Sequence, residues 1–340
     1  MVSAIIATYN RSYIVCEAID SILHQTYPNI ELIVVDDGST DSTQETLKKY
    51  GDTISIVCQN NSGPAAAWNA GIAASRGDIV SFLGSDDIWL PTFVERQVRV
   101  LQRAGSDVPC SISNCWLRFA DGRGTTSFEN AGLVTPTEEG NWLNPAEVLA
   151  TRFLVFGQTV AIRRSVLDKV GGFNNSLRYL EDYDLACRLA TLGAWGFIRE
   201  PLVVWRQSAA DSLSVEARKE NLRVLKTAVA TREHTLAELP SGSDRKNLGY
   251  LLRRSLSQSH LQLWALELLE GGGTSRELLG RIGMLSARIG LYRFRRSRRF
   301  PKMLTVNLGD IAFPACLTDH RTESENAIRG RSIITEPRDG

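Results

Sequence analysis

The chain of 340 residues lacks several features that would assign it to a specialised class of protein. It contains no uninterrupted apolar run of the roughly 18 residues that a membrane-spanning helix needs. Its six cysteines form no Cys-x-x-Cys pair, which argues against a zinc or disulfide framework. Cys58 and Cys187 lie in apolar sequence surroundings, so the cysteines are expected to be reduced core residues of a cytosolic protein. No internal repeat or low-complexity tract stands out.

An excess of charge of one sign is also missing. The net charge is +1, with 23% charged and 43% hydrophobic residues. This balance excludes binding to nucleic acid by overall electrostatics alone. No basic region precedes a long apolar core near the first residue, so no signal peptide is expected. The length suits one large α/β domain with a smaller appendage.

The first hundred residues alternate between strand and helix patterns. Dense apolar runs predict strands at residues 2–8, 31–35, 54–58 and 79–83. Helical patterns follow them at residues 12–25, 42–50, 64–75 and 91–104. This order predicts an α/β fold with a mostly parallel sheet, right-handed crossovers and flanking helices.

The pattern loosens in the second hundred residues and becomes helical after them. Strands are predicted at residues 111–118, 160–162 and 201–205, a Gly- and Thr-rich loop at 121–126 and a helix at 181–192. Long helical stretches follow at residues 215–239 and 247–270. The predicted organisation is a catalytic domain (1–210, with halves 1–105 and 106–210), a helical extension (211–302) and a polar, partly disordered tail (303–340).

Two acidic doublets follow two of the apolar runs, Asp36–Asp37 and Asp86–Asp87. The carboxyl ends of parallel strands meet at the crevice where open α/β sheets bind ligands. Four carboxylates gathered there repel one another unless a cation neutralises them, and such oxygen ligands suit Mg²⁺ or Mn²⁺ bound to phosphate oxygens. The doublets therefore favour a metal–nucleotide site. The alternative is that each pair only caps a following helix.

Four segments of the chain resemble the family 2 glycosyltransferases, which have the glycosyltransferase-A fold. They are VSAIIATYNR (2–11), VVDDGSTD (34–41), NSGPAAAWNAGIAASRGDIVSFLGSDD (61–87) and VGGFNNSLRYLEDYDLACRLATLG (170–193). They occur in the family's order and spacing and cover about residues 2–206. Any one of them is a weak signal, whereas the four together are specific.

The resemblance implies an enzyme that transfers a sugar, with inversion, from a nucleotide-diphosphate sugar to a hydroxyl. A UDP-sugar is the expected donor, a saccharide or lipid-linked saccharide the expected acceptor, and Mg²⁺ or Mn²⁺ the expected cofactor. It implies that Asp182 is the general base, with Glu181 orienting the loop or raising the pKa of Asp182 by like charge. The implied metal ligands are Asp86 and Asp87, and the implied donor-binding residues are Thr8, Tyr9, Asp36, Asp37 and Asp86.

Alternatives stay open for these residues. Glu181 and Asp182 are also typical of a helix N-terminus whose acids suit the helix dipole, although Gly171 and Gly172 allow a left-handed turn that brings the pair toward the cleft. Tyr9 and Asn10 could form a plain turn after a strand.

The chain departs from the family pattern at several positions. Gly84 stands where the family commonly has an aspartate, Trp68 where an arginine often precedes the asparagine, and residues 205–207 lack a nearby histidine. A non-catalytic sugar-nucleotide or glycan-binding relative is therefore the main alternative. A nucleotidyltransferase would need a basic Gly-rich loop at residues 7–11, which is missing. The signature of processive synthases is also missing, which favours transfer of a single sugar.

Residues 281–302 contain eight basic residues and no acid, interleaved with apolar side chains. Such a segment is typical of binding to anionic lipid, of a nucleic-acid patch or of a solvated helix face. Because the family's acceptors are often lipid-linked, the membrane surface is favoured over nucleic acid. The expected location is the cytoplasm, with peripheral binding to the inner face of the cell membrane.

Overall fold

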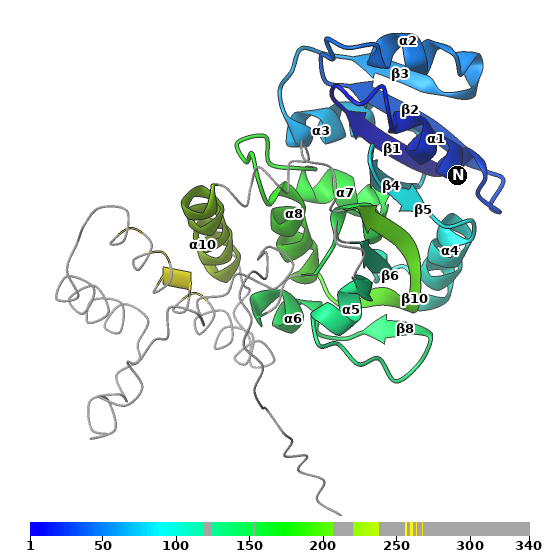
Figure 1. Cartoon of the computed structure of the whole chain (residues 1–340). Coiled ribbons are helices and arrows are strands. Elements are labelled where there is room, and N and C mark those ends of the chain that lie inside the picture. The colour runs from blue at the N-terminus through cyan, green and yellow to red at the C-terminus, as the bar shows by residue number, and fades with distance from the viewer. Residues whose placement is uncertain are drawn as a thin grey trace, which may run out of the picture.

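The computed structural model describes residues 1–118, 124–151, 154–206 and 220–237, and single helical residues at 256, 259, 260, 263 and 267. A ten-stranded sheet crosses the molecule in the order β3-β2-β1-β4-β9-β6-β10-β5, with β7 paired to β6 and β8 to β10 (Figure 1). Helices flank this sheet, so the predicted α/β class is confirmed.

The first half of the sheet consists of four parallel strands, as predicted. They are β1 (Val2–Thr8), β2 (Ile30–Asp36), β3 (Ser55–Cys58) and β4 (Ile79–Gly84). The helices that follow them are α1 (Val15–Leu23), α2 (Thr43–Lys48), α3 (Pro64–Ala74) and α4 (Phe93–Ala104), and a 3₁₀ turn, η1 (Gly51–Thr53), precedes β3. The strand boundaries agree with the sequence to within one residue, because the apolar runs of β1, β2 and β4 are mostly buried on both faces of the sheet.

The second half is mixed. Its strands are β5 (Ile88–Trp89), β6 (Cys110–Arg118), β7 (Gly124–Thr126), β8 (Glu139–Trp142), β9 (Val160–Arg163) and β10 (Trp195–Arg206). Its helical elements are α5 (Ser127–Asn130), α6 (Pro145–Thr151), η2 (Gly157–Thr159), α7 (Arg164–Val170) and α8 (Glu181–Ala190). β9 is antiparallel to both β4 and β6, whereas β10 is parallel to β6.

Three sequence predictions are wrong in this structure. β10 begins at Trp195, ahead of the predicted 201–205, because Pro201 lies at a register shift that a strand can absorb. Residues 124–126 of the predicted loop form β7. Cys58 is exposed and not a core residue, because β3 is the terminal strand of the sheet.

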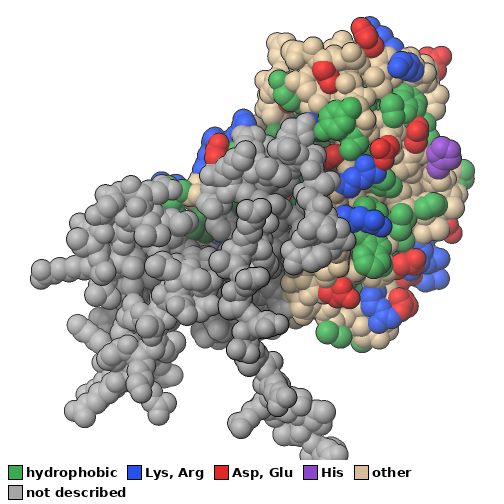
Figure 2. Space-filling view, viewed as in Figure 1, with side chains coloured by type: hydrophobic (Ala, Val, Ile, Leu, Met, Phe, Trp, Pro, Cys, Tyr) green, Lys and Arg blue, Asp and Glu red, His purple; other side chains and the backbone are tan. Residues whose placement is uncertain are grey.

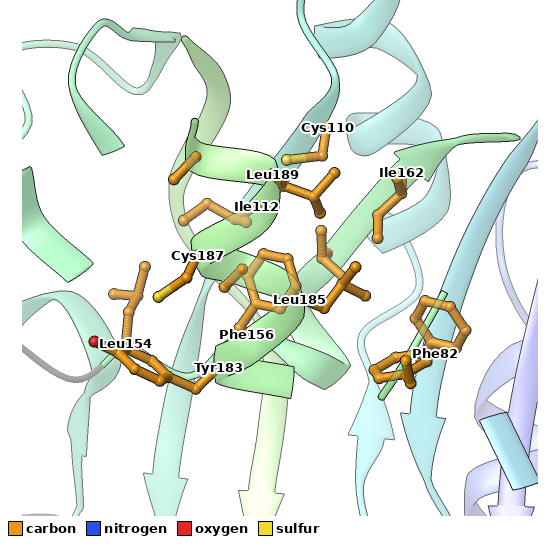
Figure 3. Close-up of a cluster of buried hydrophobic side chains, with 14 of the residues drawn as sticks. Phe82, Cys110, Ile112, Leu154, Phe156, Ile162, Tyr183, Leu185, Cys187 and Leu189 are labelled. Carbon is orange, nitrogen blue, oxygen red and sulfur yellow. The ribbon is translucent and has the colours of Figure 1, made fainter. Parts of the chain in front are cut away.

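Alternate residues of each strand pack into separate apolar layers on the two faces of the sheet. Ile5 belongs to the layer under α3 and α8, and its neighbour Ile6 to the layer under α1 and α4. In the first layer, α8 packs Leu185 and Leu189 among residues of the sheet (Figure 3). Burying one such leucine contributes about 1.5–3 kcal/mol. This packing fixes α8, and with it the acidic residues at its first turn.

The helix α10 (Asn221–Ala237) lies beside α8 (Figure 1). The Arg232 guanidinium lies 5.6 Å from the centre of the Tyr183 ring, and its Nε donates to the Tyr183 hydroxyl at 3.1 Å. This helix falls within the predicted stretch 215–239. The predicted boundary near 210–214, the basic segment 281–302 and the tail lie outside the described residues.

Acidic and basic side chains are interspersed on the face of the described part that Figure 2 shows. Among the residues that the structure describes, no helix combines the length and the apolar character needed to cross a membrane.

Candidate active site

Two polar side chains at the carboxyl ends of β1 and β2 are buried without hydrogen-bond partners. Thr8 and Asp36 are register partners, 3% and 0% exposed, and Thr8 Oγ1 and Asp36 Oδ2 have no partner. Asp36 Oδ1 accepts a hydrogen bond from the Ser39 N–H at 3.0 Å. A buried polar atom without a partner costs about 1–3 kcal/mol. A hydroxyl donor and a carboxylate acceptor are therefore available side by side for a ligand.

Asp37 accepts three hydrogen bonds from within the chain. Its carboxylate accepts from Gln59 Nε2 (2.7 Å) and from the N–H groups of Ser62 (2.8 Å) and Gly63 (2.9 Å). These bonds order the loop that leads into α3. A carboxylate has about four acceptor sites, so Asp37 retains little capacity for a ligand.

The turn after β1 is strained. Tyr9 is 43% exposed, and Asn10 has a φ of 52°, a conformation that costs a non-glycine residue free energy. Asn10 Oδ1 accepts from the Thr40 N–H at 2.7 Å, and the Asn10 N–H donates to Ser39 Oγ at 2.9 Å. The loops that follow β1 and β2 are thus joined, with the exposed Tyr9 ring beside them.

The carboxylates of Asp86 and Asp87 converge on Gly84. A Cβ added to Gly84 would lie 2.9 Å from Asp87 Oδ2 and 3.1 Å from Asp86 Oδ1. The Arg206 N–H donates to Asp87 Oδ1 at 3.0 Å. Burial and the charge of Asp86 raise the pKa of Asp87 well above its usual range, opposed by Arg206.

This cradle contains two carboxylates and no further ligand group. Across the described ranges, no cluster of three or more His, Cys, Asp and Glu residues is arranged to hold a metal ion. Two hard oxygen donors still fit Mg²⁺ or Mn²⁺, ions that usually keep several waters and bind substrate phosphates. The residues present therefore fit a cation that a phosphate ligand helps to hold.

Glu181 and Asp182 begin α8 directly after a strained residue. Leu180 has a φ of 62°. Among the described non-glycine residues, Leu180 and Asn10 are the two with a left-handed backbone conformation. Asp182 Oδ1 accepts from the Tyr183 N–H at 2.7 Å, and Oδ2 from the Gly157 N–H at 3.3 Å. Strain of this kind clusters at functional sites because the surrounding structure must maintain it.

Both acids at the start of α8 have raised pKa values. Burial, followed by the charge of Asp182, raises the pKa of Glu181 to about 8. Burial also raises the pKa of Asp182, opposed by the hydrogen bonds from Gly157 and Tyr183. At neutral pH Glu181 is thus mostly protonated and adds little negative charge beside Asp182.

The segment η2 joins this pair to the Asp86–Asp87 cradle. Its Gly157 N–H reaches Asp182, and the Gln158 carbonyl accepts from Trp89 Nε1 at 2.9 Å. The short segment η2 therefore contacts both Asp182 and Trp89, which lies two residues after Asp87. The role of η2 was not foreseen, because nothing in its sequence distinguishes it from an ordinary loop.

Asn69 is a second residue that sequence reasoning missed. Its Nδ2 donates to the Phe173 carbonyl (2.8 Å) and to Asn175 Oδ1 (2.7 Å), and its Oδ1 accepts from the Phe173 N–H (2.9 Å). Gly171 and Gly172 have φ values of 84° and 68°, so the predicted left-handed turn is confirmed. A Cβ on Gly172 would lie 2.6 Å from Asn69 Oδ1. The only signal in the sequence was one amide within an alanine-rich helix.

Comparison with solved structures identifies the class of fold. TarS 1-349 of S. aureus in complex with UDP-GlcNAc gives a TM-score of 0.56 at 16% identity, covering 91% of this chain and 78% of that one. The mannosyltransferase PcManGT of Pyrobaculum calidifontis, in complex with GDP-Man and Mn²⁺, gives 0.53 at 19% identity, covering 93% and 84%. The fold is that of the glycosyltransferase-A enzymes, as expected.

Comparison of sequences identifies the family. The model of "Glycosyl transferase family 2" matches residues 3–171. The UDP-Glc:alpha-D-GlcNAc-diphosphoundecaprenol beta-1,3-glucosyltransferase WfaP of Escherichia coli is 30% identical, over 69% of this chain and 90% of its own length. An uncharacterized glycosyltransferase of Rickettsia prowazekii, RP339, is 34% identical over 62% of this chain. This chain spans 65% of that relative's length. The protein belongs to glycosyl transferase family 2.

Proposed function

We propose that the protein is an inverting glycosyltransferase that transfers a single sugar from a UDP-sugar to a hydroxyl of a saccharide or lipid-linked saccharide. The observation that supports this proposal is that η2 contacts both Asp182 and Trp89, which closely follows the Asp86–Asp87 cradle. A leaving-group site and a base near one segment would serve a transfer reaction. A module that only binds sugars or nucleotides would not need the base.

Uracil is the base that Thr8 and Asp36 suit. Their unpartnered atoms offer a hydroxyl, which can donate, next to a carboxylate, which accepts. The edge of uracil presents an N–H between two carbonyl oxygens, so one donor and one acceptor match it. Guanine presents two adjacent donors and would need a second acceptor. The UDP-sugars named for TarS and WfaP support the same choice.

Asp86 and Asp87 are the residues that would hold Mg²⁺ or Mn²⁺. The bound ion would supply a positive charge that neutralises the departing nucleoside diphosphate. The Arg206 backbone is fixed to Asp87, and its guanidinium pairs with Glu17 on α1 (2.5 Å). An exposed pair of this kind contributes little to stability. The Arg206 side chain is therefore available as a further positive charge close to the cradle.

Asp182 is the proposed base. As the acceptor oxygen attacks the anomeric carbon from the face opposite the diphosphate, its proton passes to the carboxylate, and the configuration inverts. The N–H groups of Gly157 and Tyr183 hold the carboxylate in place. A raised pKa makes it a better proton acceptor than an ordinary aspartate. Protonated Glu181 next to it adds no competing charge.

The experiment that tests this function is a panel of UDP-, GDP- and dTDP-sugars with the purified protein. We expect one or more UDP-sugars to raise the melting temperature in the presence of Mn²⁺ and to be slowly hydrolysed. Asp87→Ala should abolish both effects. A thermal shift without hydrolysis or transfer to any acceptor would instead support a non-catalytic sugar-nucleotide-binding relative.

We further propose that residues 281–302 hold the enzyme at the inner, anionic face of the cell membrane. Each basic residue near such a surface contributes about 1 kcal/mol. The diphosphoundecaprenol acceptor named for WfaP supports a lipid-linked acceptor at that surface. The test is co-sedimentation with vesicles of varied anionic lipid content, for the full chain and for a chain that ends at residue 280. Equal partitioning of the two chains would contradict the proposal.

A further inference from the structure

We propose that Trp116 is the platform on which a sugar ring of the acceptor stacks. The inference rests on the transferase function proposed above and adds a residue that recognises the acceptor. Trp116 is 41% exposed and is the only exposed tryptophan among the described residues. An aromatic ring of this size is usually buried, so its exposure on a central strand needs an explanation.

The face of the sheet that Trp116 occupies is the face on which α8 lies. Its neighbours in β6, Cys115 and Leu117, are buried in the opposite apolar layer under α1 and α4. Side chains alternate along a strand, so Trp116 points to the same side as Ile112, which packs in the layer under α8. Trp116 therefore projects from the side of the sheet that carries Asp182.

The strand pairings place Trp116 two strands away from the residue that follows the Asp86–Asp87 cradle. Trp116 pairs with Val204 of β10, and Val204 pairs with Ile88 of β5. Neighbouring strands lie about 4.8 Å apart, so Trp116 is roughly 10 Å from Ile88, which directly follows Asp87. This interval accommodates a donor sugar next to the cradle and an acceptor sugar against the indole.

A series of strand pairings and hydrogen bonds also links the strand that carries Trp116 to the proposed base. Trp116 pairs with Thr126 of β7, and the next residue, Ser127, accepts at Oγ from the Val155 N–H (3.3 Å). Two residues further, Gly157 donates to Asp182. The segment 155–157 thus runs from the strand beside Trp116 to Asp182. The indole is positioned to form one wall of the site whose base is Asp182.

The chemistry of an indole suits the apolar face of a pyranose ring. The C–H groups on that face pack against an aromatic ring, while the hydroxyls at the rim stay free for hydrogen bonds. None of the described aromatic rings stacks on Trp116, and its 41% exposure leaves part of the indole open to a ligand. The ligand class is therefore a saccharide, recognised at the ring next to the attacking hydroxyl.

The test compares Trp116→Ala, Trp116→Phe and Ile56→Ala. Ile56 is a matched control, because it is 37% exposed on β3 at the far end of the sheet. Saturation-transfer NMR with methyl α-N-acetylglucosaminide, methyl glucosides and methyl galactosides, in the presence of UDP and Mn²⁺, reports sugar contact directly. We expect transfer to ring protons of at least one glycoside with the wild type and Ile56→Ala, a weaker signal with Trp116→Phe, and none with Trp116→Ala.

Kinetics provide the second readout. For the acceptor that the wild type uses, Trp116→Ala should raise the acceptor KM about tenfold or more, with donor KM and donor hydrolysis unchanged. Unchanged glycoside contact and acceptor KM in Trp116→Ala would overturn the inference while donor hydrolysis upheld the proposed function. A wild type that contacts no glycoside would also overturn it. If the wild type does not bind UDP, the proposed function and this inference are both contradicted.

Discussion

The loop after β2 and the first turn of α8 hold their acids in opposite ways. Asp41 is exposed, and although partial burial acts to raise its pKa, hydrogen bonds from Thr43 and Ser12 lower the pKa to about 2. Glu181 is buried with few donors, and its pKa rises to about 8. Asp41 therefore stays charged at every physiological pH. Glu181 instead lies close to the point of proton exchange.

This difference separates binding from proton transfer. A charged carboxylate tied to backbone N–H groups orders loops and holds cations, and its state does not change during a reaction. A carboxyl group with a raised pKa can take a proton and release it again. Asp87, at the end of β4 in the first half, is an exception, because burial and the charge of Asp86 raise its pKa as well.

Replacing the proposed base gives the largest expected effect and is the sharpest test of this comparison. Asp182→Asn keeps the shape of the side chain but cannot accept a proton, so kcat should fall by roughly 10²–10⁴-fold. Affinity for the sugar nucleotide should remain close to that of the wild type. The measurement is steady-state kinetics together with calorimetric titration of the donor.

Glu181→Gln is the matched control for that variant. Because Glu181 is mostly protonated at neutral pH, its amide counterpart should retain most of the activity at pH 7. If Glu181→Gln loses as much activity as Asp182→Asn, the base is not Asp182 alone. Equal loss of donor binding in both variants would indicate a structural role for the pair.

Removal of divalent metal should have the next largest effect. Excess chelator should lower turnover by about 10²-fold or more, since a metal ion supplies several kcal/mol of charge stabilisation. Gly84→Ala should weaken Mn²⁺ binding, because its Cβ would lie 2.9 Å from Asp87 Oδ2. Undiminished turnover in chelator would leave Arg206 as the neutralising group, and Arg206→Ala should then abolish activity.

The two halves also differ in how far the sequence alone predicts them. In the first half β1, β2 and β3 pair with strands one helical connection away, and local apolar runs are enough to place Val2–Thr8 and its partners. The acidic residues at the strand ends were found for the same reason. The contacts of these acidic residues were not predicted, because Asp37 accepts its hydrogen bonds from a loop more than 20 residues away.

In the second half the decisive contacts join distant parts of the chain. β9 lies antiparallel between β4 and β6, and the sequence pattern of its four residues does not predict this pairing. The N–H group that holds Asp182 comes from Gly157, 25 residues earlier. Glu181 and Asp182 were predicted as site residues only through family resemblance, since acids at a helix start are common.

Removing the hydrogen bonds that join the two halves should lower the free energy of unfolding. Asn69 joins α3 to the turn before α8 with three hydrogen bonds across 104 to 106 residues. Asn69→Ala leaves the Phe173 N–H and carbonyl without these partners, so the free energy of unfolding should fall by about 2–3 kcal/mol. Asn175→Ala removes one of the three bonds and should cost about 1 kcal/mol or less. Urea denaturation measures both, and equal losses would show that Asn69 does not join the halves.

The last expected effect is the contribution of Glu181 to the pH dependence of stability. Its pKa is about 8 in the folded protein and, with the burial removed, returns toward the model-peptide value of 4.5. Between these values the unfolded chain has released the proton that the folded chain retains. Stability contributed by the protonated group is therefore full below about pH 4.5, falls by up to about 1.4 kcal/mol per pH unit, and levels off above about pH 8. Glu181→Gln cannot titrate, so its unfolding free energy should depend less on pH across this window. Urea midpoints of the two proteins at pH 5.5, 6.5 and 7.5 measure the difference. Parallel pH profiles would show that burial does not hold the proton on Glu181, and the contrast between the two acidic regions would then rest on Asp182 alone.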